Sequence, residues 1–255
     1  MPAESSSTRK TGTPPTPDDV VTSAGDSTTP RITHAMEDYL KVAYRLQTEG
    51  GTVTTQRLAD ELGITGPSVT NMIKRLHELG LVQHTRYHGV ELTASGEKIA
   101  LEVIRHHRLL ELYLAETLGY DWDRVHDEAE RLEHHLSEEL ESRLDSALGH
   151  PKVDPHGDPI PSREGTIAAV SALRLLDVEP GQTVRVSRVS DRDPDQLRYL
   201  GELGLYPGTE VAVLEKLPFE GPVRITVGEV EHVIGRPLAA SVNVERIAGD
   251  RTSHS

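Results

Sequence analysis

The apolar positions of the chain change their spacing along its length. From Ile32 to Lys98 they recur mostly at the three-to-four-residue period of an amphipathic helix. This segment ends in two short alternating stretches, Leu81 to Thr85 and Val90 to Thr93, with a turn at residues 87–89 between them. The pattern therefore predicts a helical unit that finishes in a β-hairpin.

The helical period returns from Ile99 to Leu148, with Gly119 and Gly149 as its expected stops. Residues 150–165 contain four prolines, which exclude a regular helix, so this segment is predicted to be a linker or an ordered loop. The stretch from Thr166 to Leu176 is either a short apolar helix or a continuation of the linker.

Beyond Gly181 the pattern becomes that of strands separated by glycine and proline. The five expected strands are Thr183 to Val189, Glu210 to Leu214, Val223 to Val227, Glu231 to Ile234 and Ser241 to Ile247. They predict a small barrel, with Pro194 to Leu203 as a helical crossover. The predicted fold class is mainly α with a small β domain.

The first thirty residues differ in composition from everything that follows. They are rich in Ser, Thr, Pro and Asp, and such a segment buries too little apolar surface to offset the entropy of ordering. They are expected to form a disordered tail, and they lack the apolar stretch of a secretory signal. The expected parts of the chain are residues 1–30, 31–98, 99–150, a linker at 151–180, and 181–248.

Charge is distributed unevenly between these parts. The formal net charge is −14, yet residues 32–98 carry seven basic against eight acidic residues. Residues 99–150 carry five against thirteen, together with six of the thirteen histidines. The acidic net charge is therefore compatible with a near-neutral DNA-binding unit beside a strongly acidic one. The carboxylates of the acidic unit need cations or protons to relieve their mutual repulsion.

Cysteine is absent, which excludes disulfides, thiolate metal ligands and thiol catalysis. Any metal must be held by oxygen and imidazole nitrogen. No apolar run approaches the roughly 18 residues of a membrane-spanning helix, so we expect no membrane partner and a cytoplasmic location.

Thr54 to Leu79 has the pattern of two helices joined by a tight turn. Gly63 stands where such a turn needs a residue that tolerates positive φ, Thr65 can cap the second helix, and Pro67 suits its first turn. The apolar positions that would pack the two helices are Leu58, Leu62, Ile64, Val69, Ile73 and Leu76. This is the signature of a helix-turn-helix.

The second helix presents short polar groups followed by cations, which is how a recognition helix is equipped for double-stranded DNA. The outward residues are Ser68, Thr70, Asn71, Lys74 and Arg75. Arg86 in the hairpin turn would belong to a wing along the DNA backbone. The alternative is a helical hairpin that only packs against the rest of the chain.

Potential metal ligands are most concentrated at residues 126–135, HDEAERLEHH. On a helix, Glu130, Glu133 and His134 fall at i, i+3 and i+4 and share one face. Each residue alone is more often a solvated side chain than a ligand. Together they favour a metal site, because unneutralised carboxylates on one face repel each other.

A second cluster is predicted beside the first. His107 and Glu111 are spaced i, i+4, and His126 lies one turn before Glu130. Oxygen and imidazole ligands of this kind suit Mn²⁺, Fe²⁺ or Zn²⁺. Two neighbouring sites could therefore share one helix.

With these segments in view, the chain resembles the diphtheria-toxin-repressor family of metal-dependent transcriptional regulators. The resemblance covers residues 36–247 and rests on five segments: MEDYLKVAYRL at 36–46, GPSVTNMIKRL at 66–76, RHHRLLE at 105–111, VHDEAERLEHHLSEE at 125–139 and DPHGDPIP at 154–161. It implies a winged helix-turn-helix, a helical dimerisation and metal domain, and an SH3-like domain of the FeoA kind. It also implies a homodimer and a palindromic operator.

The resemblance implies two metal sites. It places the primary site on Asp38, Glu130, Glu133 and His134, and the ancillary site on His107, Glu111, His126, Asp193 and Gln196. Iron-type members carry Met and Cys at the places of Asp38 and Glu130, whereas manganese-type members carry Asp and Glu. Lys41 stands where two-domain manganese regulators have a further Glu. The base-contacting positions fall on Thr65, Pro67 and Asn71.

The hypothesis from the sequence is a repressor of metal homeostasis genes that Mn²⁺ activates, with Fe²⁺ as the alternative effector. A metal shared by Asp38 and the acidic helix would tie the DNA-binding unit to the dimerisation domain. A metal-dependent hydrolase is the rival class, but no separate base, nucleophile or phosphate loop is found, and we expect neither an enzyme nor an organic substrate. The third possibility is a winged-helix regulator that senses an organic ligand.

Overall fold

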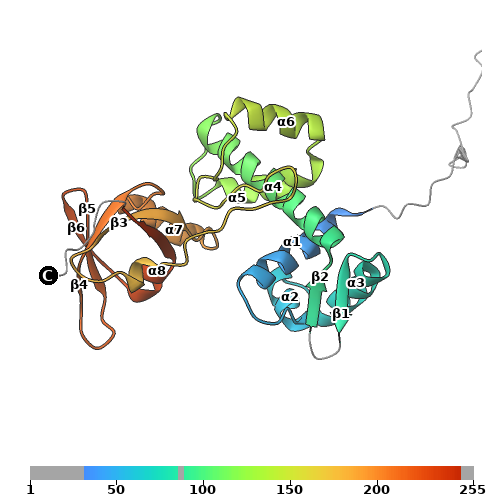
Figure 1. The fold of residues 1–255 in the computed structure, drawn as a ribbon, viewed down its shortest axis with the longest axis horizontal. Coiled ribbons are helices and arrows are strands. Elements are labelled where there is room, and N and C mark those ends of the chain that lie inside the picture. Colours follow the sequence, from blue (N-terminus) through green and yellow to red (C-terminus); the bar gives the residue numbers. More distant parts are fainter. Residues whose placement is uncertain (1–31, 86–88, 248–255) are drawn as a thin grey trace, which may run out of the picture. The chain divides into compact units, whose positions relative to one another are not determined.

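The computed structural model describes residues 32–85 and 89–247. The expected tail at residues 1–30 and the wing residue Arg86 lie outside the described residues. The first unit consists of α1 (His34–Thr48), α2 (Thr55–Leu62), α3 (Gly66–Glu78), β1 (Val82–Thr85) and β2 (Gly89–Leu92) (Figure 1). The two strands pair antiparallel, with His84 opposite Val90. The helical unit and its terminal hairpin are therefore present.

Local sequence explains the helix-turn-helix. The Thr54 side chain accepts a hydrogen bond from the backbone N–H of Arg57 and caps α2, and Gly63 ends that helix with a left-handed φ of 65°. Pro67 occupies the first turn of α3. Thr65 stands at the N-cap without a capping bond, because its hydroxyl contacts the Ser68 hydroxyl at 3.0 Å instead. The turn is thus set by glycine and proline more than by the threonine.

The next unit contains α4 (Ala94–Glu116), α5 (Val125–Leu132), a 3₁₀ turn η1 (Glu133–His135) and α6 (Glu138–Ala147). The helices α4, α5 and α6 share an apolar core of Leu110, Leu114, Val125, Ala129 and Leu144. The single helix expected through HDEAERLEHH is wrong in part, since α5 ends at Leu132. Glu133 and His134 therefore lie on a tighter 3₁₀ turn and not on a continuous α-helical face.

The segment between α6 and the C-terminal domain is irregular and ordered. Within it, residues 166–174 form no helix, so the linker alternative holds there, and only a 3₁₀ turn, η2 (Leu175–Asp177), precedes the sheet. The Asp154 Oδ1 accepts hydrogen bonds from the backbone N–H of His156 at 2.8 Å and of Asp158 at 3.0 Å. These bonds fix a tight turn in the DPHGDPIP segment.

The C-terminal domain is a five-stranded antiparallel sheet. Its elements are β3 (Thr183–Val189), α7 (Pro194–Glu202), β4 (Glu210–Lys216), β5 (Val223–Val227), β6 (Val230–Ile234), α8 (Arg236–Ala240) and β7 (Val242–Arg246). The strand order is β6-β5-β4-β3-β7, and one side of the sheet packs on a core that includes Leu197 and Leu200 of α7. In the described part of the chain, no ladder joins β6 to β7, so closure into a barrel stays a prediction.

Within residues 32–85 and 89–247, no helix combines the length and apolar character needed to cross a membrane.

Candidate metal centres

The first candidate centre lies between α1 and η1. Asp38, Glu133 and His134 each offer a ligand atom, and these atoms lie within 4.8 Å of one another. Asp38 Oδ1 is 2.8 Å from His134 Nε2, while the opposite ring nitrogen, Nδ1, contacts a Glu37 carboxylate oxygen at 2.6 Å. Burial raises the pKa of Asp38, and the neighbouring His134 partly offsets this effect. Glu37 therefore bonds one nitrogen of the His134 ring, and the other nitrogen faces the candidate ligands. This is the usual support of a metal-bound histidine.

The ammonium group of Lys41 lies in this centre, paired with the carboxylates of Glu130 and Glu133. Its Nζ donates to Glu130 Oε1 at 2.5 Å and to Glu133 Oε1 at 2.6 Å. Burial favours the neutral amine, but Glu133 and Glu130 outweigh it and raise the pKa of Lys41. The repulsion expected among these carboxylates is therefore offset by a cation of the chain itself. Glu130 groups with His107 and Glu133, and not with Asp38, in the described structure.

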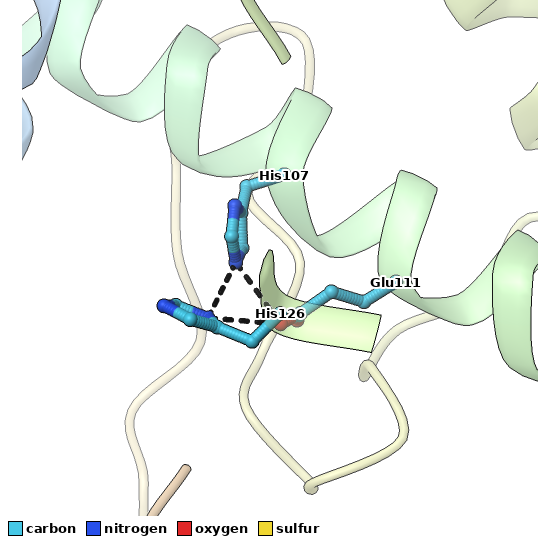
Figure 2. Close-up of side chains that lie close together, drawn as sticks. All are labelled: His107, Glu111 and His126. Carbon is cyan, nitrogen blue, oxygen red and sulfur yellow. Dashed lines mark hydrogen bonds and ion pairs between the residues drawn. The ribbon is translucent and has the colours of Figure 1, made fainter. Parts of the chain in front are cut away.

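The second candidate centre joins α4 to α5. Figure 2 shows His107 and Glu111 projecting from α4 toward His126 of α5, so that three ligand atoms form a triangle. His107 Nε2 lies 3.0 Å from Glu111 Oε1 and 3.1 Å from His126 Nδ1, and His126 Nδ1 lies 3.3 Å from Glu111 Oε1. The i, i+4 spacing on α4 produces this convergence as expected.

The two centres share a direct connection through Glu133. His107 Nδ1 lies 2.5 Å from Glu133 Oε2, while His107 Nε2 faces the second centre. Burial would lower the pKa of His107, but Glu111 and the bond to Glu133 together raise it to about 10. The pKa of Glu111 is lowered, because His107 outweighs the effect of burial. Glu133 also has a lowered pKa, since His107 and Lys41 outweigh its burial. The charge of each centre therefore affects the charge of the other through the contact between His107 and Glu133.

The residues present fit a hard divalent cation. All candidate ligand atoms are carboxylate oxygens or imidazole nitrogens, the set that suits Mn²⁺, Fe²⁺ and Zn²⁺. Glu111 is fully buried, and within the described structure its Oε2 has no hydrogen-bond partner. A buried carboxylate oxygen without a donor is costly unless a cation or a proton satisfies it.

Asp193 and Gln196 are hydrogen-bonded to each other at the start of α7. Asp193 is the N-cap of α7: its Oδ1 accepts from the backbone N–H of Asp195 and Gln196, and its Oδ2 accepts from Gln196 Nε2 at 3.1 Å. In the part of the chain that the structure describes, Asp193 belongs to no group of three converging histidine or carboxylate ligand atoms. Their ligand role, which the resemblance implies, stays a prediction.

Sequence reasoning missed three residues near these centres. Glu37 supports His134, and both His156 and Asp191 offer ligand atoms close to Glu111. The spacing of Glu37 from Asp38 gave no sign of this contact, because adjacent helix residues do not share a face. His156 and Asp191 meet only through the tertiary fold.

The predicted DNA-contacting residues lie together on the surface of the helix-turn-helix. All of the predicted residues on or next to α3 are exposed: Thr65, Pro67, Ser68, Thr70, Asn71, Lys74 and Arg75. The opposite side of α3 buries Val69, Ile73 and Leu76 in the core with α1 and α2. The helix therefore presents a polar face that ends in two cations.

Comparison with known proteins decides the family. The N-terminal DNA-binding domain of iron-dependent repressors matches residues 31–90, their metal-binding and dimerisation domain matches residues 93–162, and the FeoA domain matches residues 173–246. The iron-dependent repressor IdeR of Mycobacterium leprae is 33% identical over 224 residues, which cover 83% of this chain and 96% of that protein. The chain belongs to the diphtheria-toxin-repressor family.

As a member of this family, the chain is a metal-dependent transcriptional repressor with DNA-binding and dimerisation domains, and its relatives are repressors and not enzymes. The diphtheria toxin repressor of Corynebacterium efficiens is 33% identical over 223 residues, covering 84% of this chain and 96% of that protein. A solved manganese-dependent transcriptional repressor in complex with manganese is 39% identical, with a TM-score of 0.77 over 83% of this chain and all of that one. The structure of ScaR with bound Cd²⁺ is 33% identical, with a TM-score of 0.72 over 83% and 99% of the two chains.

Proposed function

We propose that Mn²⁺ activates this repressor by binding at two sites. The primary ligands would be Asp38, Glu130, Glu133 and His134. The ancillary ligands would be His107, Glu111 and His126, with Asp193 and Gln196 added from the resemblance. The observation that carries the proposal is the convergence of Asp38 from α1 with Glu133 and His134 from η1 in an all-oxygen and imidazole set. The solved manganese-bound relative supports Mn²⁺, and the iron-dependent relatives make Fe²⁺ the alternative.

A cation bound at the primary site neutralises carboxylates from both sides of the junction. The chain's own residues do the rest: Asp38 ties α1 of the DNA-binding unit to η1, and Glu37 orients the His134 ring. Lys41 must move from Glu130 and Glu133 if those oxygens are to serve as ligands. Fixing α1 in this way orients the recognition helix α3, with which α1 shares its core.

The repressor would read its operator through α3. Thr65, Pro67 and Asn71, in the N-terminal half of α3 and at its cap, would meet base edges, while Lys74 and Arg75 would meet phosphates. A homodimer that holds two such helices at one spacing fits successive major-groove faces of a palindrome. Metal and DNA binding are then reciprocally coupled, by about 1 to 3 kcal/mol or 5- to 150-fold in affinity.

The test is a fluorescence-anisotropy titration of a palindromic promoter fragment by the full chain. We expect tight binding with Mn²⁺ and loss of binding when a chelator is added, at constant ionic strength because phosphate contacts are salt-dependent. Asp38→Asn should weaken the Mn²⁺ response, whereas Glu139→Gln on the exposed face of α6 should not. Equal binding with and without metal would refute the proposal.

A further inference from the structure

Two consecutive histidines of α4 hold different parts of Glu133. His107 Nδ1 lies 2.5 Å from the carboxylate oxygen Oε2 of Glu133, and His106 Nδ1 lies 3.2 Å from its backbone carbonyl oxygen. A carbonyl oxygen can only accept, so the hydrogen of the second bond is on His106 Nδ1. The two rings therefore hold one residue at two places, its side chain and its main chain.

The Glu133 carbonyl lies at a point where the helix has stopped. The helix α5 ends at Leu132, η1 follows it, and the chain is extended at Leu136 and Ser137. A continuing α-helix would have bonded the Glu133 carbonyl to the N–H four residues later, which is that of Ser137. Because Ser137 is instead the N-cap of α6, the imidazole of His106 supplies a donor that a continuing helix would have provided.

This turn carries two of the proposed primary ligands, Glu133 and His134, on consecutive residues. A 3₁₀ turn has poorer hydrogen-bond geometry than an α-helix, so its conformation depends more on bonds to its surroundings. A metal site in turn requires its ligands to be held within about 0.5 Å of the productive geometry. The bond from His106 to the main chain of η1 therefore affects the placement of both ligands.

Packing alone does not account for a histidine at position 106. Its side chain is buried, and Nε2 lies 3.5 Å from Glu141 Oε2 without a hydrogen-bond partner in the described structure. Glu141 is fixed from the other side, because its Oε1 accepts from Arg105 Nε at 2.6 Å. An apolar side chain of similar size would leave no buried nitrogen without a partner. What the histidine adds is its bond to the Glu133 carbonyl.

Neither histidine contacts the Glu133 oxygen that Lys41 contacts. Lys41 Nζ lies 2.6 Å from Oε1, whereas His107 is bonded to Oε2 and His106 to the main chain. Exchange of Lys41 for a metal at Oε1 therefore leaves both bonds from α4 in place. The backbone of η1 can keep one conformation before and after the metal binds.

We propose that His106 is a positioning residue for the primary metal site: its Nδ1–H holds the Glu133 carbonyl and thereby fixes the η1 backbone that presents Glu133 and His134. The inference rests on the proposed function, since it concerns the same site, and it gives a role to a residue that is not itself a ligand. Loss of this bond should weaken metal binding at the primary site, whereas loss of packing elsewhere on α4 should not.

The experiment is titration calorimetry of Mn²⁺ binding to the full-length chain, with urea unfolding in chelator measured for every variant. His106→Leu keeps a buried side chain and removes the donor. His106→Asn restores a donor, because the amide nitrogen of asparagine takes about the place of imidazole Nδ1. Leu112→Ala is the control for destabilisation, since Leu112 packs in a separate apolar cluster with Leu109 and Ile160. The binding phase that Asp38→Asn weakens identifies the primary site.

His106→Leu should weaken this phase by about 10- to 100-fold, the loss that removal of an outer partner of a metal ligand typically causes. His106→Asn should recover most of the affinity. Leu112→Ala should unfold at lower urea with unchanged Mn²⁺ affinity. The proposal is overturned by unchanged affinity in His106→Leu, by an equal loss in His106→Asn, or by an equal loss in the control.

Hydrogen exchange in chelator separates this inference from the proposed function. Without metal, His106→Leu should speed exchange of the backbone amides of residues 134–137 more than Leu112→Ala does. A parent that binds no Mn²⁺ would refute the proposed function and with it the metal role of His106, even if exchange shows its hold on η1. A parent that binds Mn²⁺ as proposed, with no effect in His106→Leu, would refute the positioning role alone.

A crystal structure of the parent with Mn²⁺ decides the matter if His106→Leu does not fold. A bond between His106 Nδ1 and the Glu133 carbonyl, beside a metal held by Glu133 and His134, supports the proposal. A His106 ring turned away from that carbonyl overturns it.

Discussion

Glu133 uses its two carboxylate oxygens for two different partners: Oε2 lies 2.5 Å from His107 Nδ1, and Oε1 lies 2.6 Å from Lys41 Nζ. The side chain is almost completely buried. One carboxylate therefore contacts a predicted ancillary ligand on one side and the cation inside the primary centre on the other. In physical terms, this pair of contacts is a path by which occupancy of one site can alter the other.

Glu133→Gln should impair both metal sites at once. The amide removes a primary ligand and replaces the acceptor of the His107 N–H by a weaker one, and outer partners of this kind typically contribute about 10- to 100-fold in metal affinity. Mn²⁺ titration calorimetry should show both binding phases weakened. Glu139→Gln on α6 is the matched control. A variant that loses only one phase would show that the contact with His107 does not support the ancillary site.

Replacing Lys41 by Met should have opposite effects on the two states of the switch. Without metal, the buried Glu133 loses a charged partner but keeps His107, so stability in chelator should fall by about 1 to 3 kcal/mol. With Mn²⁺, removal of a competing cation should lower the metal concentration needed for DNA binding. Urea unfolding and anisotropy titrations measure the two effects, with the exposed Lys152→Met as control. A rise in the required Mn²⁺ would contradict the picture of Lys41 as a competitor.

The choice between Mn²⁺ and Fe²⁺ should depend on Asp38 and Glu130. Both offer hard oxygen, and exchanging Asp38 for Met and Glu130 for Cys softens the primary site without moving it. The double variant should shift activation toward Fe²⁺. Oxygen ligands do not bind Mn²⁺ more tightly than Fe²⁺, so activation has to be compared at free concentrations found in cells, by anaerobic DNA-binding titrations. If the parent responds to Fe²⁺ at such concentrations while Mn²⁺ activates poorly, the iron alternative stands.

Stability of the metal-free protein should depend on pH through His107. The folded-state pKa of His107 is raised from 6.5 to about 10, so its stabilising contribution is complete below pH 6.5 and is lost as the pH rises through 10. The pKa of its partner Glu111 is lowered, so Glu111 remains ionised throughout this window. Urea unfolding in chelator between pH 6.5 and 10 should show a larger loss for the parent than for His107→Gln. Parallel curves for the two proteins would show that His107 does not gain this charge interaction.

Asp193→Ala tests a residue for which the structure and the resemblance indicate different roles. Asp193 is the N-cap of α7, and loss of such a cap lowers the stability of the helix. The capping role alone predicts lower stability with an unchanged number of Mn²⁺ ions per chain. Loss of an ion in this variant, or after truncation beyond Gly165, would instead support the ligand role of Asp193 and Gln196.

The elements that the sequence predicted well are those fixed by neighbouring residues. Gly63 and Pro67 determine the turn between α2 and α3, and alternating apolar positions give the five strands of the C-terminal sheet. The end of α5 was not predicted: the helix is followed by the 3₁₀ turn η1, and the chain is extended at Leu136 and at Ser137, the cap of α6. An i, i+4 pattern alone does not show where one helix ends and the next begins.

The contacts of the candidate site that follow from residue spacing alone are those between ligands on one element. His107 and Glu111 lie one turn apart on α4, so their convergence follows from helix geometry. His156 and Asp191 come together because the segment that contains Gly157 approaches β3. The spacing of residues in the sequence does not predict this approach. Lys41 lies one turn from Asp38 on α1, yet its contacts with Glu130 and Glu133 depend on how α1 packs against α5 and η1.

The ammonium group of Lys41 makes the proposed activation an exchange of one cation for another. The metal-free protein carries a counter-ion on its own chain, so Glu130 and Glu133 are already paired with a cation before any metal binds. The threshold for response is then set by the difference between two cation affinities and not by the absolute affinity of the site. A monovalent ion from the solution has no advantage over a tethered one of the same charge, whereas a divalent ion does. Discrimination against the abundant alkali cations of a cell would thus follow from a single lysine.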